Sequence, residues 1–353
     1  MCCIIKNYNT RKKERDKVLS MSRIIDTKYV LPDTDITRQI VIEAMEEARK
    51  VIPHGKVATY IPELGKADPS RFGVVLYGLT NSKICLGDYD VRFTMQSISK
   101  LINLCVALEM FGPDIVFSKV GAEPSGEAFN SLVELDTRSN KPFNPMVNSG
   151  AIAIVDLILP KVSFDKMLAF AKEICVDDEI TLNHEVFESE MATCQRNKAI
   201  AYLLQSKGIV ENDVDDVLEL YTKLCALNVT AESLANFAKI LASDGVCQLT
   251  GRRHISSQTA RIVKTLMLTC GMYDGSGTFA VKVGIPTKSG VGGGLLAVSD
   301  KRAGIGVFSP SLDEQGNSIA GCEFLSRIAK KLKLTLFFDP EWEKITVYNN
   351  ELG

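Results

Sequence analysis

The sequence is poor in histidine, carries little net charge and has no long uninterrupted apolar run. Its 353 residues include only three histidines, whose spacing fits no metal-ligand pattern, so we expect no bound metal. A formal net charge of −2 gives no electrostatic reason to bind nucleic acid or an anionic membrane. No apolar run approaches the roughly 20 residues of a membrane span. These absences favour a soluble globular protein.

Cysteine is plentiful but lacks the spacing of a redox or metal motif. None of the ten cysteines falls in a Cys-x-x-Cys pair, and several lie inside apolar segments of helical pattern. Buried cysteines of this kind behave as small hydrophobic residues. We therefore expect free thiols, a reducing cytosol and a cytoplasmic location.

The chain also lacks the glycine patterns that bind nucleotides. The glycines at 290–294 do not form a dinucleotide fingerprint, and no Walker-type Gly-x-x-x-x-Gly-Lys-[Ser/Thr] sequence occurs. We expect no nucleotide and no other cofactor. Residues 1–30 are predicted to be a flexible tail, because their short apolar run precedes the basic residues, the reverse of a secretory signal.

Apolar periodicity predicts strands near both ends of the folded region and helices between them. Strands are predicted at 73–80, 84–87, 279–283, 295–299 and 305–308. Helices are predicted at 34–52, 151–159, 163–175, 194–206, 213–227, 230–243, 257–270 and 318–332. The simplest arrangement is an α/β (α+β) two-domain fold, in which helices flank an antiparallel sheet and an all-helical domain is inserted. The expected parts are a sheet subdomain at about 31–95 and 275–333, a helical subdomain at about 96–274, and a C-terminal tail at 334–353.

One further predicted helix, within residues 93–113, carries the most informative pair of polar residues. Ser97 and Lys100 are three residues apart, so on a helix they project from the same face. A lysine in an apolar setting loses proton affinity and can serve as a neutral base. A serine beside such a base at a helix N-terminus is a candidate acyl-transfer nucleophile.

A Ser-x-x-Lys pair alone is a weak signal, since this chain has a second match, Ser163 to Lys166, which we interpret as a helix N-cap. Support comes from Lys288-Ser289-Gly290, which is similar to the edge strand that helps form the oxyanion hole of serine β-lactamases. In that class a middle motif, Ser-Asp-Asn or Tyr-x-Asn, precedes the Lys-[Ser/Thr]-Gly strand in the chain. Here the only Tyr-x-Asn begins at Tyr348, after Lys288-Ser289-Gly290, so the middle motif is missing where chain order requires it.

Several blocks in a fixed order resemble the signature of the serine-dependent glutaminase family. They are Tyr60-Ile-Pro-Glu-Leu64, Gln96-Ser97-Ile-Ser-Lys100, Gly121-x-Glu-Pro-Ser-Gly126, Phe129-Asn130, Asn144-Pro-Met-Val-Asn148-x-Gly-Ala-Ile152, Ser189-Glu190 with Arg196-Asn197, Cys270-Gly-Met-Tyr-Asp274 and Lys288-Ser-Gly-Val-Gly-Gly293. The resemblance covers about residues 34–333. It implies a β-lactamase-like fold that hydrolyses the side-chain amide of L-glutamine to L-glutamate and ammonia, in a homodimer or homotetramer.

The resemblance also implies roles for single residues. Ser97 would be the nucleophile and Lys100 its base, while Tyr221 would assist proton transfer. Tyr273, a tyrosine of the cleft, would also belong to the catalytic residues. The implied substrate-binding positions are Tyr60, Gln96, Ser97, Asn148, Glu190, Asn197, Tyr221, Tyr273 and Val291. Among these, the Glu190 carboxylate suits the ammonium of a free amino acid.

The sequence departs from the family pattern at two places. Ser149 stands where the family usually has alanine, and residues 191–195 replace a stretch that commonly reads Thr-Gly-Asp. If the lost glycine needed a positive φ, Cys194 would strain the loop.

Two other classes of protein fit the sequence less well. The absence of the middle motif and of a recognisable signal sequence argues against a β-lactamase or D,D-peptidase. A non-catalytic amino-acid-binding protein would have no reason to keep Ser97, Lys100, Tyr221 and Tyr273 together.

Overall fold

A computed structural model of the protein describes residues 31, 34–125 and 141–337. Its centre is a five-stranded antiparallel sheet with the order β2-β1-β8-β7-β6. The strands are β1 (Gly73–Gly78), β2 (Lys83–Gly87), β6 (Thr287–Gly290), β7 (Gly294–Ser299) and β8 (Ala303–Phe308). Because β1 pairs with β8, the early and late parts of the chain meet in one sheet. The predicted fold class, with a sheet assembled from both ends, is confirmed.

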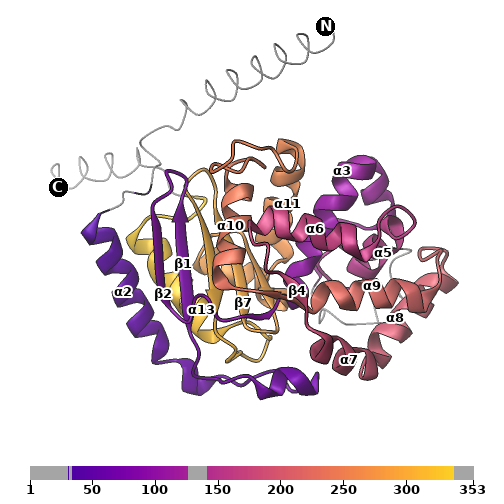
Figure 1. Ribbon diagram of the computed structural model, residues 1–353, viewed down its shortest axis with the longest axis horizontal. Helices are drawn as coiled ribbons and strands as arrows, with labels where there is room; N and C mark the ends of the chain where they lie inside the picture. Colours follow the sequence, from indigo (N-terminus) through magenta and orange to yellow (C-terminus); the bar gives the residue numbers. More distant parts are fainter. Residues whose placement is uncertain (1–30, 32–33, 126–140, 338–353) are drawn as a thin grey trace, which may run out of the picture.

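Helices cover both faces of this sheet (Figure 1). Alternate residues of β1 point to opposite faces, so Val74 packs in the cluster with α2 (Asp35–Arg49) and α13 (Ile319–Lys331), whereas Val75 faces α10 (Ala231–Ala242). Helix α10 lies very close to β8, where a Cβ added to Gly306 would be 1.8 Å from the carbonyl oxygen of Ala231. Thus α10 covers the sheet, although it lies inside the predicted helical insertion.

Most of the other helices lie together beside the sheet (Figure 1). They are α3 (Ser99–Lys119), α5 (Asn148–Ile158), α6 (Phe164–Cys175), α7 (His184–Ala192), α8 (Gln195–Ser206), α9 (Val214–Cys225) and α11 (Ser257–Cys270). Helix α12 (Ser276–Lys282) contacts α11, and its Phe279 packs against the cluster of α2 and α13. A small antiparallel sheet comprises β3 (Phe93–Thr94), β5 (Leu227–Val229) and β4 (Thr181–Leu182). Short 3-10 turns are η2 (Ile52–His54), η3 (Pro62–Lys66), η4 (Gln96–Ile98) and η5 (Tyr273–Gly275).

The strand predicted at 279–283 is wrong, because these residues belong to helix α12 and its end. Phe279 and Val283 are four residues apart and pack against the core, whereas Val281 is 92% exposed. That is the spacing of one helical face, and the short apolar run concealed it. The helix predicted at 213–227 also ends earlier, since its last residue begins β5.

Within the described part of the chain, the segment Gln96–Lys119 is long and apolar enough to cross a membrane by length and composition, contrary to the expectation that no run approaches that size. A buried core helix passes the same test, and half of the apolar window is buried inside the protein. The segment is also bent, because Gly112 has φ 75° and ψ 166° ahead of Pro113, where the sequence predicted a helix end.

The eight cysteines in the described residues are free. No group of three or more His, Cys, Asp and Glu side chains suited to a metal ion occurs in those same residues. The predicted N-terminal tail, the block Phe129-Asn130 and residues 338–353 of the predicted C-terminal tail lie outside the described residues.

Candidate active site

Ser97 and Lys100 lie where β3 gives way to the 3-10 turn η4 and then to α3. Both side chains are buried, with 8% and 1% of their surface exposed. Gln96, directly before Ser97, has φ 49°, a left-handed conformation that costs free energy in a non-glycine residue. Strain of this kind gathers at functional sites, because the surrounding structure must hold it in place.

The Lys100 amine has two hydrogen-bond acceptors, both uncharged. Its Nζ donates to Asn148 Oδ1 at 2.7 Å and to the Met146 carbonyl at 3.1 Å. Burial lowers the pKa of Lys100 to about 8, while Cys225 and Glu190 act in the opposite direction. A neutral amine has two N–H groups and one lone pair. When both N–H groups are donated, the lone pair is available to accept a proton.

The carboxamide of Asn148 connects Lys100 to Asn197. Its Oδ1 accepts from Lys100, and its Nδ2 donates to Asn197 Oδ1 at 3.0 Å. This pattern leaves the Asn197 Nδ2 as a donor for a ligand oxygen. Asn148 begins α5, whereas Asn197 lies in the first turn of α8, so three helices converge on this chain of contacts.

Glu190, in α7, supplies a buried carboxyl group with 8% of its surface exposed. Burial raises its pKa to about 7, and a hydrogen bond from Gln96 and the charge of Lys100 oppose that rise. Its Oε2 is buried and accepts no hydrogen bond from the described residues. A buried carboxylate oxygen of this kind is suited to an ammonium group.

Two tyrosines from different elements belong to the surroundings of Ser97: Tyr221 lines the same pocket and Tyr273 contacts Ser97. Tyr221 of α9 is 2% exposed, and burial holds its pKa well above the ordinary value. Tyr273 has φ 54° in η5, and its hydroxyl donates to the Ser289 carbonyl at 3.2 Å. Burial raises the pKa of Tyr273, and a hydrogen bond with Ser97 partly offsets the rise. At neutral pH both phenols therefore remain protonated.

A second buried lysine supports Tyr273. Lys288 of β6 is fully buried, donates to the Ser289 carbonyl at 2.7 Å, and lies 4.6 Å from the centre of the Tyr273 ring. Burial and the neighbouring charge of Lys100 hold the pKa of Lys288 well below its usual range. The Ser289 carbonyl thus accepts from both Tyr273 and Lys288.

These groups surround a pocket whose mouth is marked by Tyr60, which is 57% exposed. The pocket is lined by Tyr60, Ile61, Gln96, Ser97, Asn148, Glu190, Thr193, Cys194, Arg196, Asn197, Tyr221 and Cys225. Seven of the predicted site residues are among these. Lys100 lies directly behind Asn148, and Tyr273 contacts Ser97 from outside this lining. Val291 lies in the β6–β7 turn, and a Cβ on its neighbour Gly290 would lie 2.7 Å from the Met95 carbonyl, so the turn packs beside η4.

Sequence reasoning did not assign Cys225 to the site. Its thiol lies 3.6 Å from the Ser99 hydroxyl and shares a hydrogen bond with Tyr221 that contributes to the pKa values of both groups. Burial raises the pKa of Cys225 to about 12, so it remains a thiol. The available signal was its spacing from Tyr221, one helical turn earlier on α9.

The strain considered at Cys194 does not arise. Its φ is −85°, an ordinary value for an L-residue, and its Sγ donates to the Met191 carbonyl at 3.0 Å. The position therefore has no need of glycine.

Comparison with known proteins shows the family to which the chain belongs. The sequence profile of the glutaminase family matches residues 55–337. The chain is 48% identical to glutaminase 2 of Clostridium perfringens and 49% identical to the glutaminase of Clostridium tetani, in each case over 297 residues that cover 83% of this chain and 97% of the relative. It superposes with a TM-score of 0.76 on a probable glutaminase from Bacillus subtilis complexed with 6-diazo-5-oxo-L-norleucine, at 36% identity and with 84% and 94% of the two chains covered.

The fold and the matched sequence together define an amidohydrolase of β-lactamase-like architecture. This chain belongs to the glutaminase family.

Proposed function

We propose that the protein hydrolyses the side-chain amide of L-glutamine to L-glutamate and ammonia through an acyl-enzyme on Ser97. The observation that carries this mechanism is the state of Lys100, a buried amine with a pKa of about 8 whose two hydrogen-bond acceptors are uncharged. An amine with a pKa near 8 is partly unprotonated near neutral pH and largely so in mildly alkaline solution, so it can act as a base, and it stands on the same short segment as Ser97.

In the acylation step Lys100 takes the proton of the Ser97 hydroxyl as Oγ attacks the amide carbon. The negative charge that develops on the amide oxygen needs backbone N–H donors, and those of Ser97 and Val291 are the proposed pair. Collapse of the tetrahedral intermediate breaks the C–N bond. The departing nitrogen takes a proton from Lys100 or from the protonated phenol of Tyr221 and leaves as ammonia.

Recognition of a free amino acid fits the opposite part of the pocket. The Glu190 Oε2, which accepts no hydrogen bond from the described residues, pairs with the substrate ammonium. Amide donors such as the Asn197 Nδ2 bind the carboxylate. Tyr60 covers the mouth above them.

Ammonia release tests this proposal. Wild type is expected to release ammonia from L-glutamine, and not from L-asparagine or a chromogenic β-lactam, while Ser97→Ala abolishes the release. Ser99→Ala is the matched control, because Ser99 contacts Cys225 and does not line the pocket. Activity that survives Ser97→Ala contradicts the acyl-enzyme. A chain that binds glutamine without turnover is a binding protein.

We also propose a homodimer or homotetramer in the cytoplasm. The free cysteines of the described residues support a reducing compartment. Light scattering of the purified chain tests the assembly, for which a single-chain mass is the contrary result, and fractionation of the source cells tests the location.

A further inference from the structure

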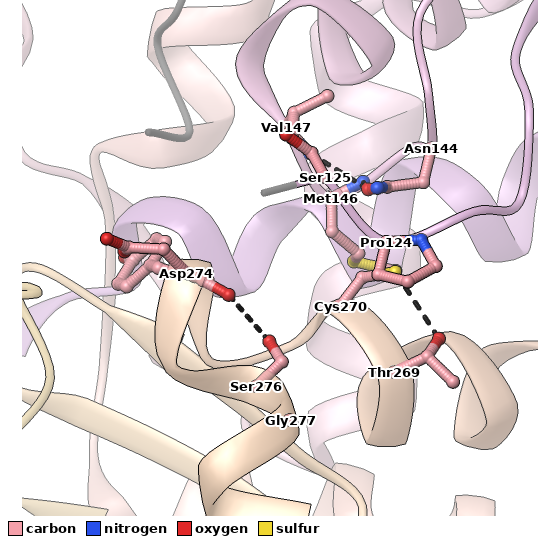
Figure 2. Close-up of a pocket in the computed structure, with 11 residues that line it drawn as sticks. Pro124, Ser125, Asn144, Met146, Val147, Thr269, Cys270, Asp274, Ser276 and Gly277 are labelled. Atoms are coloured by element: carbon pink, nitrogen blue, oxygen red, sulfur yellow. Dashed lines mark hydrogen bonds between the residues drawn. The ribbon is translucent and has the colours of Figure 1, made fainter. Parts of the chain in front are cut away.

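A second pocket, shown in Figure 2, is lined in part by Tyr273, which does not line the pocket around Ser97. It is bounded by the segment before α5, the end of α11 and the start of α12. Its lining includes Met146, Thr269, Tyr273, Asp274 and Gly277.

The two pockets share a thin wall that contains catalytic groups. Tyr273 lines the second pocket, yet its hydroxyl hydrogen-bonds with Ser97, which lines the first. Met146 lines the second pocket and Asn148 the first, and the Lys100 Nζ bonds to both of them, at 3.1 Å and 2.7 Å. The second pocket is therefore separated from the nucleophile and its base by little more than one tyrosine side chain.

The proposed acyl-enzyme mechanism, on which this inference rests, requires a path for ammonia to leave and for water to enter while the glutamyl group is bound. The glutamyl group stays bonded to Ser97 and fills the pocket between Ser97 and the mouth at Tyr60, with its ammonium at Glu190. Ammonia is formed behind that group and must depart before hydrolysis. A water molecule must then reach the same carbon from the side that ammonia left.

We infer that the second pocket is the route by which ammonia leaves and water reaches the acyl-enzyme, with Tyr273 as its inner wall. The molecules that would pass through it, ammonia and water, are small and both donate and accept hydrogen bonds. The hydroxyl of Thr269 and the carboxylate of Asp274 line it, and the latter suits an emerging ammonium ion. In deacylation the water oxygen bonds to the acyl carbon, its proton passes to Lys100, and the bond from carbon to Ser97 Oγ breaks as Oγ regains a proton.

Gly277 offers a way to narrow this pocket without touching the catalytic groups. It is exposed, it lines the pocket, and a Cβ added there would meet no heavy atom within 4 Å (Figure 2). Gly277→Phe fills the space, and Gly277→Ala is the matched control. Thr269→Phe fills the pocket from α11 instead of α12, with Thr269→Ser as its control, in case one filled variant does not fold.

The decisive readout is the size selectivity of nucleophiles that capture the acyl-enzyme. During glutamine turnover, hydroxylamine and N-methylhydroxylamine replace water and give two γ-glutamyl hydroxamates, which mass spectrometry quantifies. In Gly277→Phe we expect the ratio of the smaller to the larger product to rise at least about tenfold over Gly277→Ala, with a fall in kcat of similar size. Thr269→Phe should act in the same direction.

An unchanged product ratio in both filled variants overturns the inference, whatever happens to kcat, because nucleophiles would then enter by the mouth at Tyr60. Failure of the proposed function appears separately. In that case the wild type and Gly277→Ala release no ammonia from glutamine, or the release survives Ser97→Ala.

Discussion

The Nζ of Lys100 and the Oδ1 of Asn148 lie 2.7 Å apart, and this contact joins α3 to α5 at the centre of the active site. The partner of the proposed base is thus a neutral amide. An amide orients the lysine without stabilising its charged form as strongly as a carboxylate would, so burial keeps the pKa of Lys100 low. The neutral amide at position 148 therefore predicts how the pH dependence of the enzyme changes when a carboxylate replaces it.

Asn148→Asp should move the pH dependence of the enzyme upward. An adjacent carboxylate favours the ammonium form and raises the pKa of Lys100 by roughly 1–3 units. We expect the rise of kcat with pH to shift by at least about one unit. Asn197→Asp is the matched control, since its carboxylate is one hydrogen bond further from Lys100. Equal shifts in the two variants would contradict a direct role for the Asn148 amide.

The wild-type kcat/KM should rise with pH and level off above pH about 8. The proposed mechanism needs Glu190 ionised, with its pKa raised to about 7, and Lys100 neutral, with its pKa lowered to about 8. Both conditions require loss of a proton, so activity is lost as pH falls through these values. In Glu190→Gln the residual activity should keep only the Lys100 step. A profile that is flat between pH 6 and 9 in the wild type would count against both assignments.

Lys288→Met should lower kcat more than it changes KM. The substitution removes the donor to the Ser289 carbonyl and the amine beside the Tyr273 ring, two contacts that hold Tyr273 against Ser97. We expect a fall in kcat of at least about tenfold. Lys282→Met makes the same chemical change at an exposed position and should have little effect. If the two variants have equal kcat, Lys288 does not position Tyr273.

Gly306→Ala should destabilise the fold while Gly277→Ala does not. A Cβ at Gly306 would lie 1.8 Å from the Ala231 carbonyl, so α10 must move away from the sheet. Overpacking of this kind costs about 1–3 kcal/mol, which urea unfolding can measure. Gly277 is the control, because its added Cβ meets open space. Equal unfolding midpoints would show that α10 adjusts freely.

Much of the fold was predictable because its signals are local. The hairpin of β1 and β2 and the N-cap at Ser163 follow from neighbouring residues, whereas the helix end predicted at Gly112 is only a bend, because α3 continues to Lys119. The prediction failed at α12, where a run of seven residues is too short for its period to distinguish a helix from a strand.

The sequence by itself determined the family, through its ordered blocks, and the spacing of Ser97 and Lys100 led us to propose a nucleophile and a base. Only the tertiary structure decided how that chemistry is controlled. It places the Met146 carbonyl and Asn148 on the Lys100 amine and sets Lys288 beside Tyr273. It also leaves a second pocket behind that tyrosine. Such contacts join residues that are far apart along the chain. The periodicity of a sequence indicates only which face of a helix or strand is buried. Which residue a buried side chain contacts is therefore decided only when the helices and strands pack together.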